Sequence, residues 1–328
     1  MNVTRALVAT LFALGVLICP LAADAQQAAN VARIGFLGAT SPTGWASRVE
    51  AFRLGLRELG YVEGKNLIIE FRWADEHYDR LPRLAAELLR LKVDLLVTYG
   101  TPASLAAKRA TTTIPIVMVH SGDAVVAGIV ASLARPGANL TGSTYFLPQL
   151  MAKRLELLKD AVPRIGQVAI LVKPDNPFFA PAIRALDLAA DALKIRLLQF
   201  EARTPSEFGA AFSAMSKRRV DAVVILEDAV FVTHVKTIAQ LAAKHRLPTA
   251  GFQELATVGG LIGYGVDFLE LYRRAAVFAD KILSGTKPAD IPVEQASKFD
   301  LLINLKTAKA LGLTIPPSLL LRADQVIE

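Results

Sequence analysis

Two kinds of segment alternate along the chain. Segments of the first kind are short runs of successive apolar residues, which is typical of strands covered on both faces. The clearest of these runs lie within residues 33–38, 92–97, 167–172 and 219–224. Segments of the second kind have apolar residues spaced three or four apart, as in residues 48–60, which predicts amphipathic helices. Strands that alternate with helices predict parallel sheets joined by right-handed crossovers.

The two halves of the chain repeat each other. Residues 92–97, KVDLLV, correspond to residues 219–224, RVDAVV. Residues 105–117 begin with LAAKRA, and residues 241–250 begin with LAAKHR at the same place in the pattern. The order strand, loop, helix, strand, loop, helix and short strand is the same in both halves. We therefore predict an α/β protein with two doubly wound parallel-sheet lobes and a ligand cleft between them.

Each expected lobe is discontinuous in sequence. The N-terminal lobe comprises residues 26–143 and 265–286, and the C-terminal lobe comprises residues 144–264 and 287–328. The chain is expected to return to the first lobe before the helix predicted from Phe268, because that helix needs a sheet to cover and the second lobe already has its own helices.

The first 25 residues have the features of a secretory signal peptide. Arg5 supplies a positive charge, residues 6–22 are apolar, and Ala23-Asp24-Ala25 matches the A-x-A pattern of a cleavage site. The alternatives are a membrane anchor and a lipoprotein signal at Cys19. The apolar run is short for a membrane span, and the residue before Cys19 is Ile18 rather than a small one. We expect cleavage after this segment and a periplasmic mature chain.

Composition and charge exclude some classes of protein. Hydrophobic residues make up 53% of the chain and charged residues 20%, which is too little charge for a disordered chain. The net charge is +7, but the basic residues are scattered singly over predicted helices, and no basic run alternates with aromatic residues. We therefore expect no nucleic-acid partner, and we expect the chain to act as a monomer.

The sequence carries no known catalytic motif. The G-x-S-x-G, H-E-x-x-H, Walker and G-x-G-x-x-G patterns are all missing. Its four histidines lack the spacing of a metal site. A hydrolase or isomerase that uses Asp123, Asp228 and His120 across the cleft is the alternative, but it lacks a complete set of nucleophile, base and orienting group. We expect no enzyme activity, no metal and no cofactor.

The joint between the apolar run at residues 92–97 and the helix after it is bare. Residues 100–104, Gly-Thr-Pro-Ala-Ser, carry no charge and little side chain. The free N–H groups and the positive dipole end at the start of a helix attract an anion, and small side chains let a ligand reach the backbone. The alternative is ordinary tight-turn chemistry, which also requires glycine and proline.

The loops that follow the predicted strands divide the chemistry between the lobes. The first lobe offers hydroxyl groups and helix N-termini, which suit a carboxylate, and the second offers carboxylates, which suit an ammonium group. The candidate ligand-binding residues are Thr40, Ser41, Trp45, Gly100, Thr101, Pro102, Ser121, Asp123, Asp175, Asn176, Asp228 and Phe252. The alternative roles are an Asx turn at Asp175 and Asn176, a helix N-cap at Asp228, and simple packing of Trp45.

Nearly all of the expected mature chain resembles a known family. The similar segments are residues 60–117, residues 132–142, with the sequence SLARPGANLTG, and residues 271–328. These segments resemble periplasmic substrate-binding proteins of ABC transporters, in the group with the type I periplasmic-binding fold. The resemblance implies two lobes that close on a small solute and present it to a permease in the inner membrane. Ala124 and Ala229 stand where the family often has proline.

We therefore expect an exported solute-binding component of an ABC importer. The complementary loop chemistry favours an amino-acid-like ligand or a small organic acid. The alternative is a ligand-sensing domain of a signalling system, which would need a fused DNA-binding or transmembrane signalling segment.

Overall fold

The first lobe is built on a six-stranded parallel sheet. The structure is a computed structural model, and it describes residues 31–176 and 179–328. The strand order in this sheet is β11-β5-β4-β3-β1-β2. The strands are β1 (Ala32–Gly38), β2 (Leu67–Trp73), β3 (Leu95–Thr98), β4 (Ile116–Met118), β5 (Leu140–Thr144) and β11 (Glu294–Gln295). All of the pairings are parallel, as the apolar runs predicted.

Helices cover both faces of this sheet. On one face α2 (Ala46–Glu58) packs against α11 (Phe268–Leu283), and on the other α3 (Leu81–Arg90) packs against α4 (Gly100–Ala110). Within β3, Val97 belongs to the apolar cluster under α2 and α11, whereas Leu96 belongs to the cluster under α3 and α4. Because successive side chains point to opposite faces, a strand buried on both faces is apolar at every position.

The second lobe is built on a seven-stranded sheet with the order β13-β12-β10-β9-β8-β6-β7. Its strands are β6 (Gln167–Val172), β7 (Arg196–Glu201), β8 (Ala222–Ile225), β9 (Thr249–Gly251), β10 (Ile262–Gly265), β12 (Asp300–Asn304) and β13 (Gln325–Ile327). Strands β6 to β10 are all parallel to one another, whereas β12 runs antiparallel to β10. The sequence analysis did not predict that antiparallel pair.

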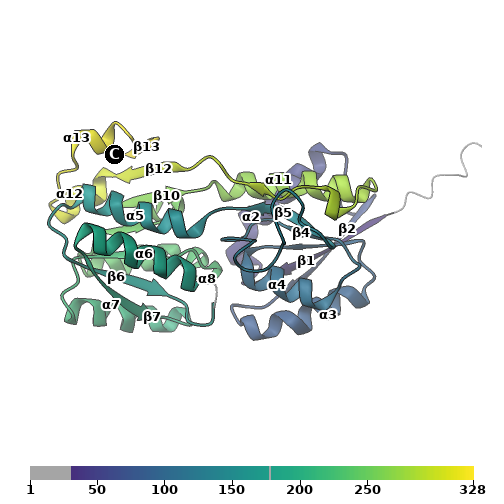
Figure 1. Cartoon of the computed structure of the whole chain (residues 1–328), viewed down its shortest axis with the longest axis horizontal. Helices are drawn as coiled ribbons and strands as arrows, with labels where there is room; N and C mark the ends of the chain where they lie inside the picture. Colours follow the sequence, from purple (N-terminus) through teal and green to yellow (C-terminus); the bar gives the residue numbers. More distant parts are fainter. Residues whose placement is uncertain (1–30, 177–178) are drawn as a thin grey trace, which may run out of the picture.

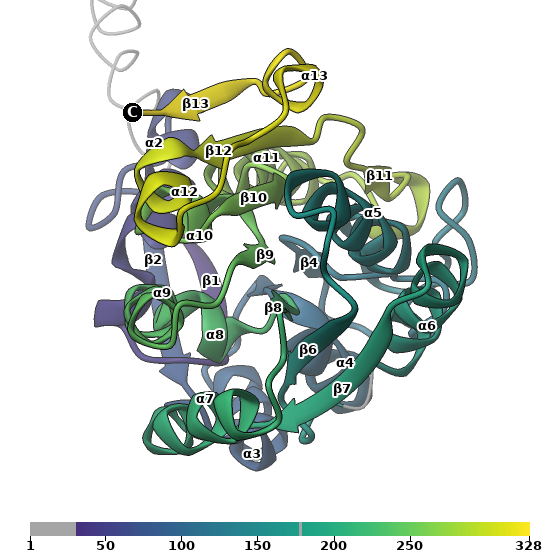
Figure 2. The same cartoon turned by 90° about the vertical axis from the view of Figure 1, so that its left-hand side faces the viewer.

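The helices of the second lobe also lie on both faces of their sheet. They are α5 (Leu147–Ala161), α6 (Ala180–Leu193), α7 (Phe208–Lys217), α8 (Ala229–Thr233), α9 (Val235–Lys244), α10 (Gln253–Thr257), α12 (Leu305–Leu311) and α13 (Pro317–Leu320). Figure 2 looks onto this lobe and shows α5 and α6 on one side of β6, with α7 and α9 on the other.

The two sheets share one strand order. The order β2-β1-β3-β4-β5 in the first lobe corresponds to β7-β6-β8-β9-β10 in the second. This correspondence explains the internal sequence repeat, because β3 and β8 each begin at the residue after the aspartate of the repeated DLLV and DAVV runs. The two parallel-sheet α/β lobes predicted from the sequence are confirmed, and they lie side by side along the long axis of the molecule (Figure 1).

The chain passes between the lobes more than once. Strand β5 leads into α5 of the second lobe, β10 leads into α11 of the first, and β11 leads into β12 of the second. The expected boundary at residue 287 needs correction. Strand β11 pairs with β5, the Thr141 hydroxyl donates to the Ile291 carbonyl at 2.8 Å, and Val293 is buried in the first lobe. These contacts give the edge of β5 a partner and keep residues 287–295 with the first sheet.

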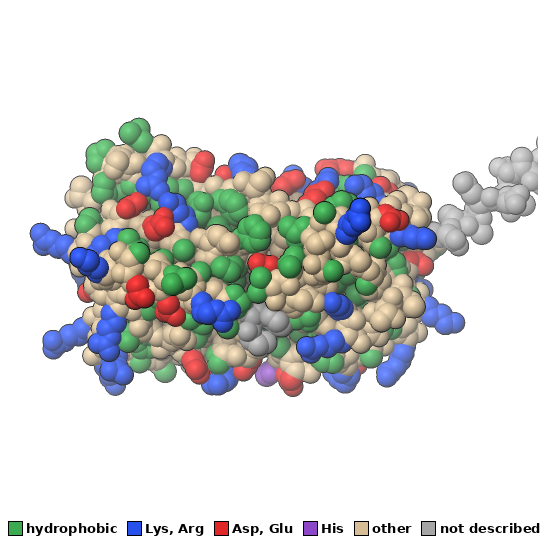
Figure 3. Space-filling model, viewed as in Figure 1, with side chains coloured by type: hydrophobic (Ala, Val, Ile, Leu, Met, Phe, Trp, Pro, Cys, Tyr) green, Lys and Arg blue, Asp and Glu red, His purple; other side chains and the backbone are tan. Residues whose placement is uncertain are grey.

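The expected signal peptide, residues 1–25, lies outside the described residues. Within residues 31–176 and 179–328, no helix is both long and apolar enough to cross a membrane. Lys and Arg side chains are spread over both lobes on the face shown in Figure 3 and do not gather into a single strip.

Candidate functional site

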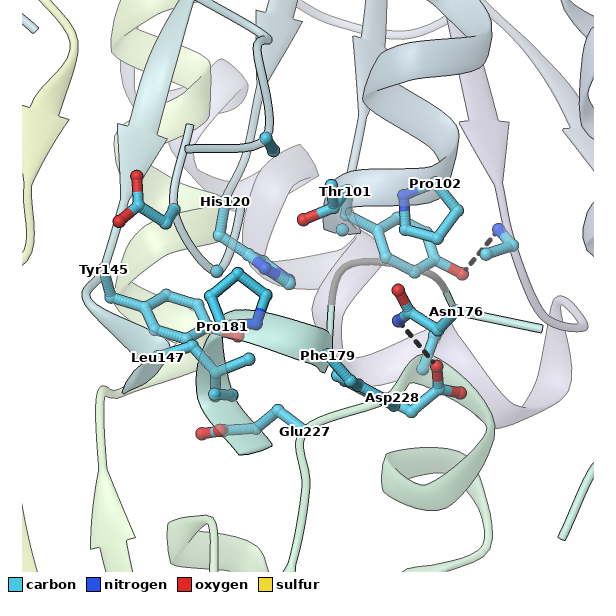
Figure 4. Close-up of a pocket in the computed structure, with 18 of the residues that line it drawn as sticks. Thr101, Pro102, His120, Tyr145, Leu147, Asn176, Phe179, Pro181, Glu227 and Asp228 are labelled. Atoms are coloured by element: carbon cyan, nitrogen blue, oxygen red, sulfur yellow. Dashed lines mark hydrogen bonds between the residues drawn. The ribbon is translucent and has the colours of Figure 1, made fainter. Parts of the chain in front are cut away.

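A cavity of about 300 Å³ lies between the two lobes. The carboxyl ends of the parallel strands supply its walls, because loops after β1, β3, β4, β6 and β8 all reach it. Figure 4 shows side chains from both lobes converging on this space. Of the candidate residues, those that line it are Trp45, Gly100, Thr101, Pro102, Asp123, Asn176 and Asp228.

The bare joint after β3 forms one wall of this cavity. Gly100 has a φ of +72°, a left-handed conformation that suits glycine, and its N–H donates to the His120 carbonyl at 3.0 Å. Pro102 has no N–H. Because α4 begins at Gly100, the Thr101 amide is the remaining first-turn donor that has no carbonyl partner within the helix. The segment is therefore a tight turn that also lines the cavity.

Asp228 occupies the matching place in the second lobe. Thr101 lies three residues after the end of β3, and Asp228 lies three residues after the end of β8. The Asp228 carboxylate caps α8 by accepting from the Val230 N–H at 2.9 Å. The same carboxylate accepts from the Tyr78 hydroxyl at 2.8 Å and from the Asn176 amide at 3.1 Å. Asp228 is therefore both a helix cap and a cavity-lining residue.

The charge state of Asp228 depends on its surroundings. Burial raises the pKa of its carboxyl group, whereas the hydrogen bonds from Asn176, Tyr78 and Val230 and the nearby Lys173 charge lower it. Burial also raises the pKa of Tyr78, so its hydroxyl remains protonated and donates to the carboxylate. A ligand cation beside Asp228 would favour the charged form further.

A second carboxylate in the lining is already neutralised. Glu227 is held by Arg154 through contacts of 2.8 Å and 2.5 Å, and Arg154 also donates to the Tyr264 carbonyl at 2.7 Å. The Arg154 side chain is fully buried. The pair joins α5, β10 and the end of β8, so it fixes the floor of the cavity close to two of the crossovers between lobes.

Aromatic side chains make up much of the remaining lining. Trp45 stacks on Tyr99 with ring centroids 4.4 Å apart, and His120 lies 4.9 Å from the ring of Phe268. Tyr145 lies beside His120, with ring centroids 6.0 Å apart. All five of these residues line the cavity. Trp45 therefore packs in the interior between α2 and the cavity rather than on the surface.

Sequence reasoning left several of these residues out of the candidate set. Tyr99, His120, Tyr145 and Phe268 line the cavity, as do Tyr78 and Glu227. Two of these residues could have been found from the sequence. Tyr99 stands directly before the Gly100–Ser104 joint, and Phe268 begins the helix that follows a crossover between the lobes. Both positions lie next to strand ends that the sequence identified.

The remaining candidates lie outside the cavity lining. Thr40 is buried, and its backbone N–H and hydroxyl contact the Tyr99 hydroxyl at 3.1 Å and 3.0 Å, so it positions that ring instead. The Ser41 hydroxyl lies 3.4 Å from that of Thr43. Asp175 is paired with Lys173 and Arg203 and does not line the cavity. Ser121 and Phe252 are buried in the interior of their own lobes.

Polar contacts connect the two lobes around the cavity. Besides Tyr78 and Asp228, the Arg48 guanidinium of α2 donates to Glu254 of α10 at 2.6 Å. The Glu76 Oε1 atom of the first lobe lies 2.6 Å from the His234 Nε2 atom of the second. The lobes are therefore in contact on more than one side of the cavity, as in a closed binding cleft. Within the described residues, no cluster of three or more His, Cys, Asp or Glu side chains could hold a metal ion.

Comparison with known proteins confirms the family resemblance. The model of the family described as "ABC transporter substrate binding protein" matches residues 34–327. A relative named "Tyrosine-binding protein", from Clostridioides difficile, is 28% identical over 265 residues, which cover 80% of this chain and 76% of the relative.

Two solved structures are similar to this chain over most of its length. A conserved domain protein from Vibrio cholerae has a TM-score of 0.83 and 26% identity, covering 90% of this chain and 99% of its own. An "ABC domain in complex with L-Trp" from Streptococcus pneumonia has a TM-score of 0.81 and 26% identity, with the same coverage of both chains.

Proposed function

The chain belongs to the family of ABC transporter substrate-binding proteins, and we propose that it captures an aromatic α-amino acid in the interlobe cavity and delivers it to a permease for import. Two relatives support this ligand class, one named for tyrosine binding and the other solved with L-Trp. The cavity volume of about 300 Å³ is at the small end of the range for ligand pockets, which suits a single small solute.

One observation carries the proposal. Equivalent positions of the two lobes face each other across the cavity with complementary chemistry, Thr101 at the start of α4 and Asp228 at the start of α8. The Thr101 amide and the dipole of α4 suit the ligand carboxylate, and Asp228 suits its ammonium group. The rings of Trp45, Tyr99 and Phe268 suit an aromatic side chain.

Ligand binding and lobe closure are coupled in this arrangement. The carboxylate site belongs to the first lobe and the ammonium site to the second, so only a closed cleft satisfies both ends of the ligand. Hydrogen bonds to charged groups are worth about 1.5–3 kcal/mol each, which favours the closed form when an amino acid is bound.

Export completes the proposed role. Arg5, the apolar residues 6–22 and Ala23-Asp24-Ala25 support cleavage before Gln26 and release into the periplasm, where a permease in the inner membrane would receive the loaded protein. N-terminal sequencing of the native protein tests this part separately. A chain that retains Met1 would contradict it.

Calorimetric titration of residues 26–328 tests the ligand. We expect L-Tyr or L-Trp to bind, and we expect analogues without the carboxylate, tyramine and tryptamine, to bind at least tenfold more weakly. Analogues without the amine, such as 3-(4-hydroxyphenyl)propionate, should lose a similar factor. Equal binding of the amine-free analogues and the amino acids would overturn the assignment of Asp228, and no binding by any aromatic amino acid would overturn the proposed ligand class.

A further inference from the structure

His120 is a buried polar side chain that the proposed binding of the amino-acid head group does not use. It follows β4, and its backbone carbonyl accepts from the Gly100 N–H. The residue is 7% exposed and its side chain lines the cavity. Neither ring nitrogen has a hydrogen-bond partner among the described residues. A buried donor or acceptor without a partner costs free energy, so the imidazole is a group that a ligand atom could satisfy.

The imidazole offers neutral hydrogen-bonding groups. Burial, together with the nearby Arg48 charge, lowers the pKa of His120 to about 3, so the ring is uncharged at physiological pH. A neutral imidazole has one N–H donor and one nitrogen acceptor. The rings of Phe268, Tyr145 and Tyr99 surround it at centroid distances of 4.9, 6.0 and 6.3 Å, and none of them forms a hydrogen bond with it.

The position of His120 within the cavity decides which part of a ligand reaches it. In Figure 4, Asp228 and Asn176 lie at one side of the cavity, and Tyr145 and Leu147 lie at the opposite side. His120 lies next to Tyr145 and points into the space between the two sides. A ligand with its ammonium group at Asp228 would therefore extend its side chain towards His120.

We propose that His120 is a specificity-determining residue, which selects aromatic amino acids with a polar ring atom, a phenol hydroxyl or an indole N–H, over phenylalanine. This inference rests on the proposed function. The phenol hydroxyl can donate to the acceptor nitrogen or accept from the N–H, and the indole N–H can donate to the acceptor nitrogen. The phenyl ring of phenylalanine offers neither a donor nor an acceptor to the ring nitrogens of His120.

Calorimetric titration of residues 26–328 with L-Tyr, L-Trp and L-Phe tests the inference. For the wild type we expect L-Phe to bind about tenfold more weakly than whichever of L-Tyr and L-Trp binds more tightly. A factor of about ten corresponds to the free energy of one hydrogen bond. In His120→Phe, L-Tyr and L-Trp should weaken to within about threefold of L-Phe, while L-Phe binding is retained. The matched control is Ser121→Ala, because the Ser121 hydroxyl is also buried without a partner among the described residues but does not line the cavity.

The outcomes separate this inference from the proposed function. If the wild type binds L-Phe as tightly as L-Tyr and L-Trp, the selectivity role fails while the proposed ligand class stands. If His120→Phe keeps the wild-type preference, the role also fails. If no aromatic amino acid binds the wild type, both proposals fail. If His120→Phe does not fold, His120→Gln replaces it, because the glutamine amide still offers a hydrogen-bond donor and an acceptor. A preference of this variant for L-Tyr and L-Trp over L-Phe supports the role of His120, and loss of that preference overturns it.

Discussion

The Tyr78 hydroxyl of the first lobe donates a hydrogen bond of 2.8 Å to the Asp228 carboxylate of the second. Asn176 and the Val230 N–H occupy further acceptor positions of the same carboxylate. An ionised carboxylate has about four acceptor positions, so these three donors leave room for one more. Asp228 therefore links the closure of the lobes to the place proposed for a ligand cation.

Asp228→Asn should weaken binding of an aromatic amino acid by roughly ten- to a hundredfold, because the ammonium group loses a buried charged partner. The amine-free analogue should bind the variant as it binds the wild type. Calorimetric titration measures both. Asp267→Asn is the matched control, because Asp267 also caps a helix, α11, but does not line the cavity. Equal affinity of Asp228→Asn and the wild type for the amino acid would refute the role of Asp228.

Thr101→Val should weaken binding by less than Asp228→Asn, by about three- to tenfold. Valine matches the shape of threonine but removes the hydroxyl, while the backbone amide of residue 101 and the α4 dipole remain to bind the carboxylate. The same titration measures this variant. A loss confined to ligands that carry a carboxylate supports the role of the hydroxyl, whereas an equal loss for tyramine points to altered packing instead.

Gly100→Ala should lower the free energy of unfolding by about 1–2 kcal/mol, because a side chain is strained at the left-handed φ of +72°. The added methyl group meets no close neighbour, so backbone strain alone is tested. Chemical denaturation measures the change. Gly209→Ala is the control, because Gly209 is a helical glycine of α7 with open space around it, and alanine there should stabilise the protein slightly.

Glu254→Gln should shift the free protein towards an open cleft and weaken ligand binding several-fold. The change leaves the Arg48 guanidinium, which lies 4.4 Å above the Trp45 ring, without its charged partner across the cleft. Small-angle X-ray scattering should show a larger radius of gyration without ligand. Arg83→Ala breaks an exposed pair with Glu87 inside α3 and should change neither quantity. An unchanged scattering profile for Glu254→Gln would show that this pair does not hold the lobes together.

Acidification should destabilise the protein through His120. The folded pKa of about 3 lies below the usual 6.5, so between these values the unfolded chain binds a proton that the folded chain does not. Between pH 6.5 and about pH 3, this group then lowers the free energy of unfolding by about 1.4 kcal/mol for each pH unit. Burial raises the pKa of Asp228 and Glu254, which acts in the opposite direction.

The difference between the wild type and His120→Phe isolates the histidine from those two carboxyl groups. Urea denaturation at pH 7 and pH 5 should show a smaller loss of stability in the variant. Equal losses in both proteins would contradict a buried, neutral His120.

The sequence by itself determined the architecture of this protein. Continuous apolar runs identified strands covered on both faces, and the repeated DLLV and DAVV segments identified two lobes with the same order of elements. The bare Gly100–Ser104 joint marked a helix start at the cavity, because few residue types suit that turn. These features depend on local periodicity and backbone chemistry, which neighbouring residues in the chain decide.

Only the tertiary structure decided which side chains face the cavity. Thr40 and Ser121 follow strands as Thr101 does, yet both are turned into the interior, and the rings of His120 and Phe268 line the cavity instead. A change of one residue in register at a strand end turns a side chain from the cleft to the core. Phe268 reaches the site only because the chain crosses back to the first lobe, and Asp228 gains Tyr78 only because the lobes meet. Such relations join residues far apart in the chain, and no local pattern encodes them.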